Sequence, residues 1–478
     1  MVPSVVITPN PPAIGPHGQD AERVAYSRMC RRILYGEHLQ DVNARIAVQI
    51  PDVRQSAWGR PDMGSNPFKA VWSVLSTLYD RGPSVSLGTS DGLIVPAQDL
   101  AKRAAGQGLW SLMSRVQRDT LALREMWMRV SVAPRDGAPG QFDPVYEPAY
   151  PDVVHAEASG DRPGVPHAIW HARLRETSDG VEWMWDHVSV EDPEHPVYRI
   201  VRAHGDKLVD VSSAYPDSGA GSWPDVWRDR QGRPVLPYVL YHAAQTPYLY
   251  DPYQTRELVE GTLNLAVLRT YVAHVARSAA WRQRYTIDCY LTGAEAVAEG
   301  DDGKTRTRVV LDPATIAAFN RSSDEANPQV GTFDLPAVPS ELWEYIEGYE
   351  RKLIAEAGIN PADQMAMKGD PRSGFALAVS RDSQREAKRR FEPQFQRCDQ
   401  ELLRVTAVQL NRAEGRSYPE FGYRVTYKGV PQSAPERAAL RAHLLELMSA
   451  GLLDPVSAYQ ELHPGVTDPE ALSALRAI

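Results

Sequence analysis

Apolar residues recur every three or four positions along two long stretches in the last third of the chain. In the first stretch, which opens at Ser340, they are Leu342, Ile346, Tyr349, Leu353 and Ile354. In the second they are Phe391, Phe395, Cys398, Leu402, Val405 and Val408. This spacing places them on one face of a helix, so we predict a helix, a loop over 359–372 and a second helix over 373–413. A helix of about forty residues is ~60 Å long, which is unusual in a small globular enzyme.

The first half of the chain changes from a helical period to the alternation of strands. Residues 1–19 are rich in Pro and Gly, which is typical of an extended or mobile arm. Helices are predicted over 20–35, 67–79, 97–105 and 109–123. Strands bounded by Gly, Pro and Asp are predicted over 126–132, 168–175, 181–188, 197–202 and 207–211. Helices followed by strands indicate an α+β fold and not a doubly wound sheet.

A second helical region follows the strands and encloses a small insert. Residues 254–283 predict a long helix. Alanines on its apolar face would let neighbouring helices approach closely, and we expect burial of this face to require a neighbouring subunit. In the insert, strands are predicted at 285–291 and 305–311, on either side of an acidic turn. Beyond residue 415, the segment 421–427 alternates as a strand. Ser433, Asp454 and Asp468 then open three further helices, the first of which ends at Gly451.

Composition restricts the possible classes of protein. The 478 residues have a net charge of -9, with 43% hydrophobic and 24% charged residues, which suits a folded chain and argues against a free basic DNA-binding protein. Cys30, Cys289 and Cys398 show neither a metal-binding spacing nor a disulfide framework, so a reducing compartment is expected. No stretch of 18 apolar residues predicts a membrane span, and the N-terminal segment does not resemble a secretory signal.

Motifs for catalysis are missing from the sequence. A stretch over 298–305 imitates a phosphate-binding loop, but Ala298 replaces its first glycine and its acidic residues would repel phosphate. His167 and His171 are four residues apart in a predicted strand, where they share a face only loosely. The acidic pairs Glu191-Asp192 and Asp301-Asp302 lie in turns. We therefore expect no catalytic residue, no cofactor and no metal.

Basic residues gather at the start of the longest predicted helix. We expect Arg381, Arg385, Lys388 and Arg389 to line either the channel or a subunit interface of an assembly. The simpler interpretation is a solvated helix face, because Asp382, Glu386 and Glu392 offer partners, some of them four residues away. In a ring, one basic residue per subunit becomes a circle of charge that can hold phosphates without reading sequence.

The order of these elements resembles that of the portal proteins of tailed bacteriophages. RELVEGTLNLAVLRTYVAHVARSAAWRQRY is similar to a first stem helix, and ELWEYIEGYERKLIAEAGINPADQM to a second stem helix leading into a tunnel loop. SGFALAVSRDSQREAKRRFEPQFQRC is similar to the start of the long wing helix, and YRVTYKGVPQSAPERAALRAHLLELMSAGLLDPVSAYQEL to a returning strand and the C-terminal helices. The likeness lies in the layout of about residues 60–475, because portals share architecture far better than sequence.

The resemblance implies a division of the chain into eight parts. They are a mobile arm at 1–19, an α/β wing at 20–253, a first stem helix at 254–283, a clip at 284–338, a second stem helix at 339–358, a tunnel loop at 359–372, a long kinked helix with a returning wing strand at 373–429, and a helical crown at 430–478. Pro393 removes a backbone donor, so the long helix is expected to kink or restart near Arg389–Glu392.

The resemblance also implies a function and partners. Portals form rings, normally of twelve subunits, at one vertex of the virion capsid, assembled in the bacterial cytoplasm. Double-stranded DNA passes through the ring without sequence-specific contacts. The large terminase docks on the clip, head-completion or adaptor proteins later replace it, and the major capsid and scaffolding proteins surround the ring. The portal itself is not an enzyme, and no membrane is involved.

Two sets of residues are predicted to act in such a ring. The tunnel loop would face DNA with Gln364, Met365, Met367, Lys368 and Arg372, where methionines give a soft apolar lining and Lys368 adds a positive charge. The simpler alternative is that this loop only connects the two helices and that its methionines pack against the stem. The clip would dock the terminase or adaptor through a surface of mixed charge, although such charges can also serve only to keep a hairpin soluble. This surface comprises Glu299, Asp301, Asp302, Lys304, Arg306 and Arg308.

Two other classes remain open from sequence. One is a different ring-forming tail or baseplate protein, which a ring without a DNA-sized channel would favour. The other is a hydrolase whose strand-rich region holds a carboxylate site outside the known motifs. A ligand-sized cleft with converging carboxylates would favour it.

Overall fold

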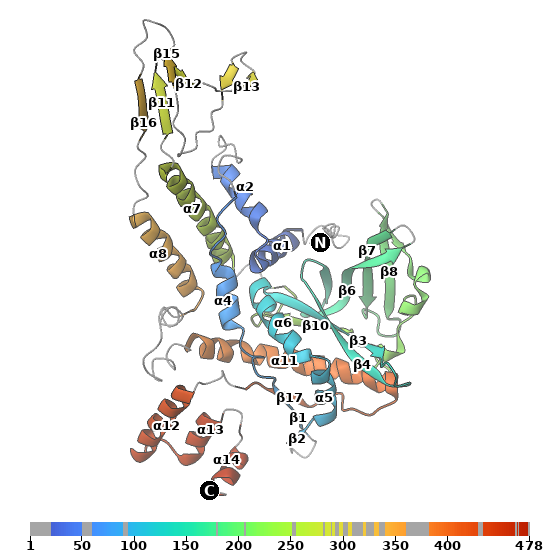
Figure 1. Ribbon diagram of the computed structural model, residues 1–478. Helices are drawn as coiled ribbons and strands as arrows, with labels where there is room; N and C mark the ends of the chain where they lie inside the picture. Colours follow the sequence, from blue (N-terminus) through green and yellow to red (C-terminus); the bar gives the residue numbers. More distant parts are fainter. Residues whose placement is uncertain are drawn as a thin grey trace. The chain divides into compact units, whose positions relative to one another are not determined.

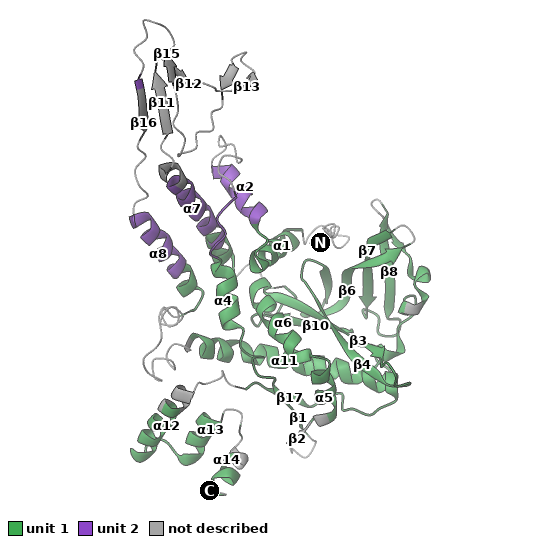
Figure 2. Cartoon of the chain, viewed as in Figure 1, with its two compact units in different colours: residues 1–38, 66–261, 353–478 green, residues 39–65, 262–352 purple. Residues whose placement is uncertain are grey.

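The computed structural model describes most of the chain outside the N-terminal arm, the insert and the loop before the long helix. The described residues are 21–49, 60–88, 94–177, 180–204, 207–250, 255–280, 283–287, 289–291, 296–299, 305–307, 319–321, 329–333, 340–359, 382–428, 434–463, 466 and 468–476. The chain forms two compact units (Figure 2). Unit 1 comprises 1–38, 66–261 and 353–478, and unit 2 comprises 39–65 and 262–352.

Eleven α-helices lie in the described residues (Figure 1). Unit 1 holds α1 (Ala21–Tyr35), α4 (Pro67–Leu75), α5 (Gln98–Gly106), α6 (Leu109–Leu123), α11 (Asp382–Glu414), α12 (Ala434–Ser449), α13 (Pro455–Leu462) and α14 (Asp468–Arg476). Unit 2 holds α2 (Leu39–Gln49). The helices α7 (Arg256–Ala280) and α8 (Ser340–Glu356) each contribute residues to both units.

Within the described residues, three antiparallel sheets belong to unit 1. The first has the order β17-β1-β2, with β1 (Ser84–Gly88), β2 (Ile94–Pro96) and β17 (Tyr423–Thr426). The second has the order β10-β3-β4, with β3 (Glu125–Pro134), β4 (Phe142–Ala149) and β10 (Tyr238–His242). The third runs in sequence order through β5 (Val154–Ser159), β6 (Arg162–Thr177), β7 (Gly180–Ser189), β8 (Val197–His204) and β9 (Lys207–Asp210).

Local signals explain where several helices begin and end. Asn66 accepts a hydrogen bond from the Lys69 amide, and Pro67 occupies the first turn of α4, where its missing N–H costs nothing. The carboxylate of Asp454 likewise accepts from the amides of Val456 and Ser457 at the start of α13. At the end of α12, Gly451 has a φ of 71°, a left-handed conformation that suits glycine.

The sheet β10-β3-β4 has one face against the long helix and the other toward the five-stranded sheet. Met126, Met128 and Val130 are fully buried on the first face, where α11 contacts β3, β4 and β10. Trp127 points the other way and joins a hydrophobic cluster that includes Ile169 from β6. The alternation of side chains along β3 therefore supplies two separate cores.

Unit 2 is built on α2, α7 and α8. Leu265 and Val272 of α7 pack with Ile346 of α8 in one buried cluster. On the α2 side, Arg45 Nη1 donates to Asn264 Oδ1 at 3.0 Å. Leu265 and Val272 are thus covered within the chain, whereas Val275, farther along the same predicted face, is 41% exposed. The expectation that this face needs a neighbouring subunit stays a prediction.

The strands of the insert pair in a nested order within unit 2. β11 (Gln283–Ile287) pairs with β16 (Gln329–Phe333), β12 (Cys289–Leu291) pairs with β15 (Phe319–Arg321), and β13 (Ala296–Glu299) pairs with β14 (Thr305–Thr307). The predicted hairpin joined 285–291 to 305–311. The structure corrects this pairing, because the strands nearest the acidic turn are β13 and β14, and residues 285–291 find their partners farther along the chain.

Much of the predicted secondary structure is confirmed. Helix α6 has the predicted bounds, and the other helices predicted before residue 125 begin within one residue of their expected positions. The five predicted strands match β3 and β6 to β9, which confirms a mixed helical and sheet fold of the α+β kind. The prediction missed α2, β1, β2, β4, β5 and β10, and in the insert β13, β15 and β16. The predicted helix 67–79 ends four residues early, at Leu75.

The long helix α11 is continuous from Asp382 to Glu414, with Pro393 inside it. The expectation that the helix restarts near residues 389–392 was wrong. A proline inside a helix loses a single backbone hydrogen bond, while the side chains of Phe391 and Phe395 on either side of it are buried. A bend of the helix axis at Pro393 stays a prediction, as does helix between 373 and 381, which lies outside the described residues.

Candidate functional site

The predicted DNA-facing loop lies outside the described residues. This applies to Gln364, Met365, Met367, Lys368 and Arg372, so their role stays a prediction. The helix before the loop is described to its end, where Gly358 has a φ of 94°. This left-handed conformation terminates α8 and directs the chain into the loop.

Only part of the predicted docking surface on the insert is described. Glu299 ends β13 opposite Thr305, and Arg306 of β14 stands opposite Ala298. One acidic and one basic residue are thus at neighbouring register positions of one short hairpin. Asp301, Asp302, Lys304 and Arg308 lie outside the described residues.

The predicted basic residues of the long helix do not form one uniform face. Lys388 Nζ donates to the carbonyl oxygen of Tyr427 at 3.2 Å and lies 3.8 Å from Glu392 Oε2, so this lysine is held inside the subunit. Arg385 is half-buried, whereas Arg389 is exposed. Arg381 lies outside the described residues. Of the described members of the set, Arg389 is therefore the one fully presented to solvent.

Three tyrosine hydroxyls converge on the carboxylate of Asp399, near the middle of α11. Tyr241 Oη donates to Oδ1 at 2.8 Å, and Tyr427 Oη donates to Oδ2 at 2.6 Å. Tyr79 Oη lies 2.8 Å from Oδ2 and 3.0 Å from Oδ1. Asp399 is 0% exposed. We call these four residues the Asp399 cluster; it joins α11 to β10 and to the segments that follow α4 and β17.

The electrostatics of the Asp399 cluster follow from its burial. Removal from water raises the pKa of Asp399 to about 6, against the opposing effect of the three O–H donors. Burial and the nearby carboxylate raise the pKa of Tyr79, Tyr241 and Tyr427 well above the ordinary value. The hydroxyls therefore remain protonated donors at neutral pH. A buried carboxylate that is satisfied by neutral donors fixes the rotation of the helix about its axis.

A second polar anchor holds the end of α11. Arg103 of α5 forms two hydrogen bonds with the Glu414 carboxylate, at 2.6 and 2.8 Å, and the backbone amide of Phe142 donates to the same carboxylate at 2.7 Å. The hydrogen bonds from Arg103 hold the pKa of Glu414 at about 2. The bidentate pair of Arg103 and Glu414, together with the Phe142 amide, connects α5, β4 and the end of α11.

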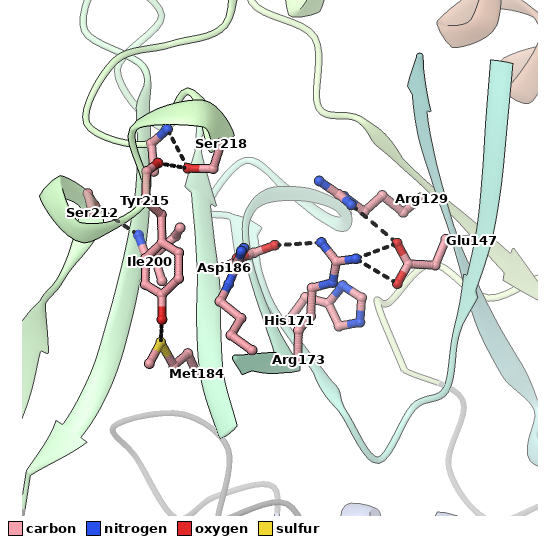
Figure 3. Close-up of polar contacts among 12 residues, drawn as sticks. Arg129, Glu147, His171, Arg173, Met184, Asp186, Ile200, Ser212, Tyr215 and Ser218 are labelled. Carbon is pink, nitrogen blue, oxygen red and sulfur yellow. Dashed lines mark hydrogen bonds and ion pairs between the residues drawn. The ribbon is translucent and has the colours of Figure 1, made fainter. Parts of the chain in front are cut away.

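A polar network lies between β4 and the five-stranded sheet (Figure 3). The Glu147 carboxylate accepts hydrogen bonds from Arg129 at 3.2 Å and from Arg173 at 3.0 and 3.1 Å. Asp186 accepts from Arg173 at 3.3 Å and from Arg175 at 2.5 Å. Three guanidinium groups thus surround two carboxylates, and each carboxylate is held by two of them.

Burial and charge act in opposite directions in this network. Burial alone would raise the pKa of Asp186, but Arg175, Arg129 and Arg173 outweigh it and the pKa is lowered. Burial lowers the pKa of His171 to about 4, so its ring is neutral at pH 7, and its Nδ1 lies 3.2 Å from Tyr238 Oη. Paired charges and a neutral histidine are typical of a structural connection between sheets and not of a general acid or base.

The metal site considered for His167 and His171 does not form. His171 is buried in the network, whereas His167, four residues earlier in β6, lies 3.8 Å from Glu157. In the part of the chain that the structure describes, no group of three or more His, Cys, Asp or Glu side chains is arranged to hold a metal ion.

A cavity of about 560 Å³ opens in unit 1 beside the first turns of α6. Its wall includes Tyr79, Asp80, Gly82, Trp110, Ser111 and Ser114. The rings of Tyr79 and Trp110 are stacked, with their centroids 6.1 Å apart and an interplanar angle of 16°. The cavity has the size of a small-molecule or side-chain site; the sequence analysis gave no indication of it.

Sequence reasoning overlooked the Asp399 cluster and the network in Figure 3, although each has a local signal. Asp399 interrupts an apolar stripe between Cys398 and Leu402, and a charge on a buried face requires a partner. In β6, His171, Arg173 and Arg175 are each two residues apart, so their side chains lie on one face of the strand. These signals mark the positions but do not identify their partners.

The comparisons with other proteins leave the function open. No protein-family model matches the chain, and no characterised protein matches its sequence. Within the described residues, no helix combines the length and apolarity needed to cross a lipid bilayer.

Proposed function

We propose that this chain is the subunit of a bacteriophage portal, a ring that conducts double-stranded DNA at one capsid vertex. The observation that carries the proposal is the arrangement of α7 and α8. These two helices flank an insert whose strands pair only with one another in the described residues, and they pack together through Leu265, Val272 and Ile346. A pair of long helices that carries a small separate β insert suits a stem and clip.

The long helix supports the same proposal. α11 lies across the sheet β10-β3-β4 and is fixed at its middle by the Asp399 cluster and at its end by Arg103. A helix held at two points can position the loop that precedes it. In a portal, residues 359–372 would face the channel from this position, with Lys368 making weak, salt-sensitive contact with phosphates.

A contact between subunits is assigned to α8, beside the part of the α7 face that is covered by Ile346. On α8, Trp343 and Tyr345 are 37% and 59% exposed, and the ring of Tyr345 stacks on that of Tyr349 at 6.4 Å between centroids. Exposed aromatic side chains on a helix are common anchors at protein interfaces. We assign the side of α8 that presents Tyr345 to the contact between neighbouring stems, because Trp343, two residues earlier, lies on nearly the opposite side of the helix.

Electron microscopy of the purified chain tests the proposal. We expect closed rings with an axial channel wide enough for duplex DNA, and mass photometry should show one dominant oligomer. A chain that remains monomeric at micromolar concentration would overturn the proposal. A ring without such a channel would favour a tail or baseplate protein instead.

A further inference from the structure

The cavity beside α6 contains a carboxylate with no partner in its own chain. Asp80 lines the cavity, and within the described residues its carboxylate takes part in no ion pair or side-chain hydrogen bond. Desolvation raises the pKa of Asp80, although its side chain is exposed. Because the Asp80 side chain is exposed and unpaired within the described residues, its carboxylate is open to a group that enters the cavity.

The other walls define the kind of group that completes the site. The Trp110 indole stacks on Tyr79, whose hydroxyl is already engaged by Asp399, so Tyr79 offers only its ring to the cavity. Ser111 and Ser114 add hydroxyl oxygens that can accept hydrogen bonds. An aromatic wall, a carboxylate and hydroxyl acceptors suit a planar cation that stacks and donates several hydrogen bonds.

An anion is the alternative, because the cavity lies at the start of α6, where Gly108 provides no capping side chain. Asp80 would repel such an anion across the same small space. The negative charge of Asp80 therefore favours a positively charged ligand.

We propose that this cavity binds an arginine side chain of a second copy of this chain, with Arg389 as the residue inserted. Arg389 is exposed on α11 and has no ion-pair partner among the described residues. Its planar guanidinium can stack on Trp110 while it donates to Asp80. In the proposed ring the contact is heterologous, because each subunit offers Arg389 to one neighbour and the cavity to the other.

This inference rests on the proposed ring and names one of its interfaces. The ring supplies the second copy, and the contact joins unit 1 of one subunit to unit 1 of the next. It is separate from the contact assigned to the side of α8 that presents Tyr345.

Charge reversal tests the interface in the full chain. Asp80→Arg and Arg389→Asp should each place like charges together and raise the subunit concentration at which rings dissociate by about tenfold or more. The double variant Asp80→Arg/Arg389→Asp should restore the wild-type value, because opposite charges again meet. Asp136→Arg, at an exposed position of the β3–β4 turn, is the matched control and should leave the value unchanged. Single variants that dissociate like the wild type, or a double variant that shows no recovery, would overturn the proposal.

A second measurement tests the chemistry of the cavity without a ring. The full chain, labelled with 5-fluorotryptophan, is studied by fluorine NMR at a protein concentration where the subunits are dissociated, and N-acetylarginine amide is added stepwise. The resonance that is missing from the spectrum of Trp110→Phe belongs to Trp110. We expect the Trp110 signal to shift with the arginine derivative and not with N-acetylglutamate amide, and Asp80→Asn should abolish the shift. A shift that persists in Asp80→Asn, or no shift at all, rules out the cation site. If the wild-type chain forms no ring but the shift is seen, the proposed function fails while the chemistry of the cavity stands.

Discussion

Tyr427 donates a hydrogen bond of 2.6 Å to the buried carboxylate of Asp399, and this contact ties the segment after β17 to the middle of α11. The same carboxylate binds Tyr241 of β10 and Tyr79 from the segment after α4. One side chain therefore fixes the long helix against three other parts of unit 1. If α11 supports the channel loop, as proposed, the Asp399 cluster sets the position from which that loop starts.

The raised pKa of Asp399 predicts a specific dependence of stability on pH. The pKa is about 6 in the folded chain and lies near its ordinary value of 3.8 when the chain unfolds. The protonated form therefore favours folding, and this contribution is lost as the pH rises from about 4 to about 6. The loss is on the order of 3 kcal/mol in the free energy of unfolding. Asp399→Asn should remove this part of the pH profile, which urea titrations at several pH values measure. Asp136→Asn serves as the control, and an unchanged profile in Asp399→Asn would contradict the prediction.

Glu414 should show the opposite pH dependence. Its pKa is held at about 2 by Arg103, below its ordinary value of 4.5, so its stabilising contribution is present above pH 4.5 and is lost as the pH falls toward 2. Glu414→Gln should weaken the pairing with Arg103 and cost about 2 kcal/mol at neutral pH. Glu386→Gln changes an exposed residue of the same helix and should have little effect. Urea midpoints at pH 7 compare the two variants, and equal midpoints would show that the Arg103 pairing contributes nothing measurable.

Two helical glycines should respond to alanine in opposite ways. A Cβ at Gly261 of α7 would overlap Leu353 Cδ2 and lie 2.8 Å from Leu353 Cδ1, whereas a Cβ at Gly348 of α8 meets nothing within 4 Å. Gly261→Ala should therefore destabilise the packing of α7 on α8 by about 1 kcal/mol, even after its gain in helix propensity. Gly348→Ala should stabilise the helix by up to about 1 kcal/mol. Thermal unfolding of both variants gives the comparison. An equal response would mean that the two helices separate easily at Gly261.

The channel prediction concerns Lys368. In the proposed ring, Lys368→Glu should leave assembly unchanged and lower the amount of DNA retained in filled heads, because it replaces a circle of positive charge with negative charge. The measurement is DNA per particle after packaging at low and high salt, with Lys102→Glu on the exposed side of α5 as the control. If the variant matches the wild type at both salt concentrations, Lys368 does not face DNA.

The docking prediction concerns the turn between β13 and β14. Deletion of residues 295–304 should leave rings intact, because the strands of the insert pair with one another and not with the helices in the described residues. DNA packaging should be abolished, since the proposed terminase surface is removed. Electron microscopy checks the rings and a packaging assay checks the function. Normal packaging would place the docking surface elsewhere.

The sequence by itself determined the elements that depend on local periodicity. The bounds of α6, the apolar face of α8 and the buried stripe Phe391–Val408 of α11 all follow from the spacing of apolar residues, because a helix or strand partitions its side chains by a fixed geometric repeat. The capped starts of α4 and α13 follow from side chains that bond the first backbone amides. The mixed helical and sheet class was therefore predictable.

Only the tertiary structure decided which polar residues meet and which faces are covered. Asp399 finds Tyr79 and Tyr241, which are 320 and 158 residues away, and Glu147 finds Arg173 on another sheet. The partner of β11 was likewise misjudged from sequence. Such contacts join residues that are far apart in the sequence. Hydrophobic periodicity and secondary-structure propensity are local properties, so they do not show which distant residues will meet. A charged residue within an apolar stripe of the sequence indicates that it has a partner, but only the fold shows which residue that partner is.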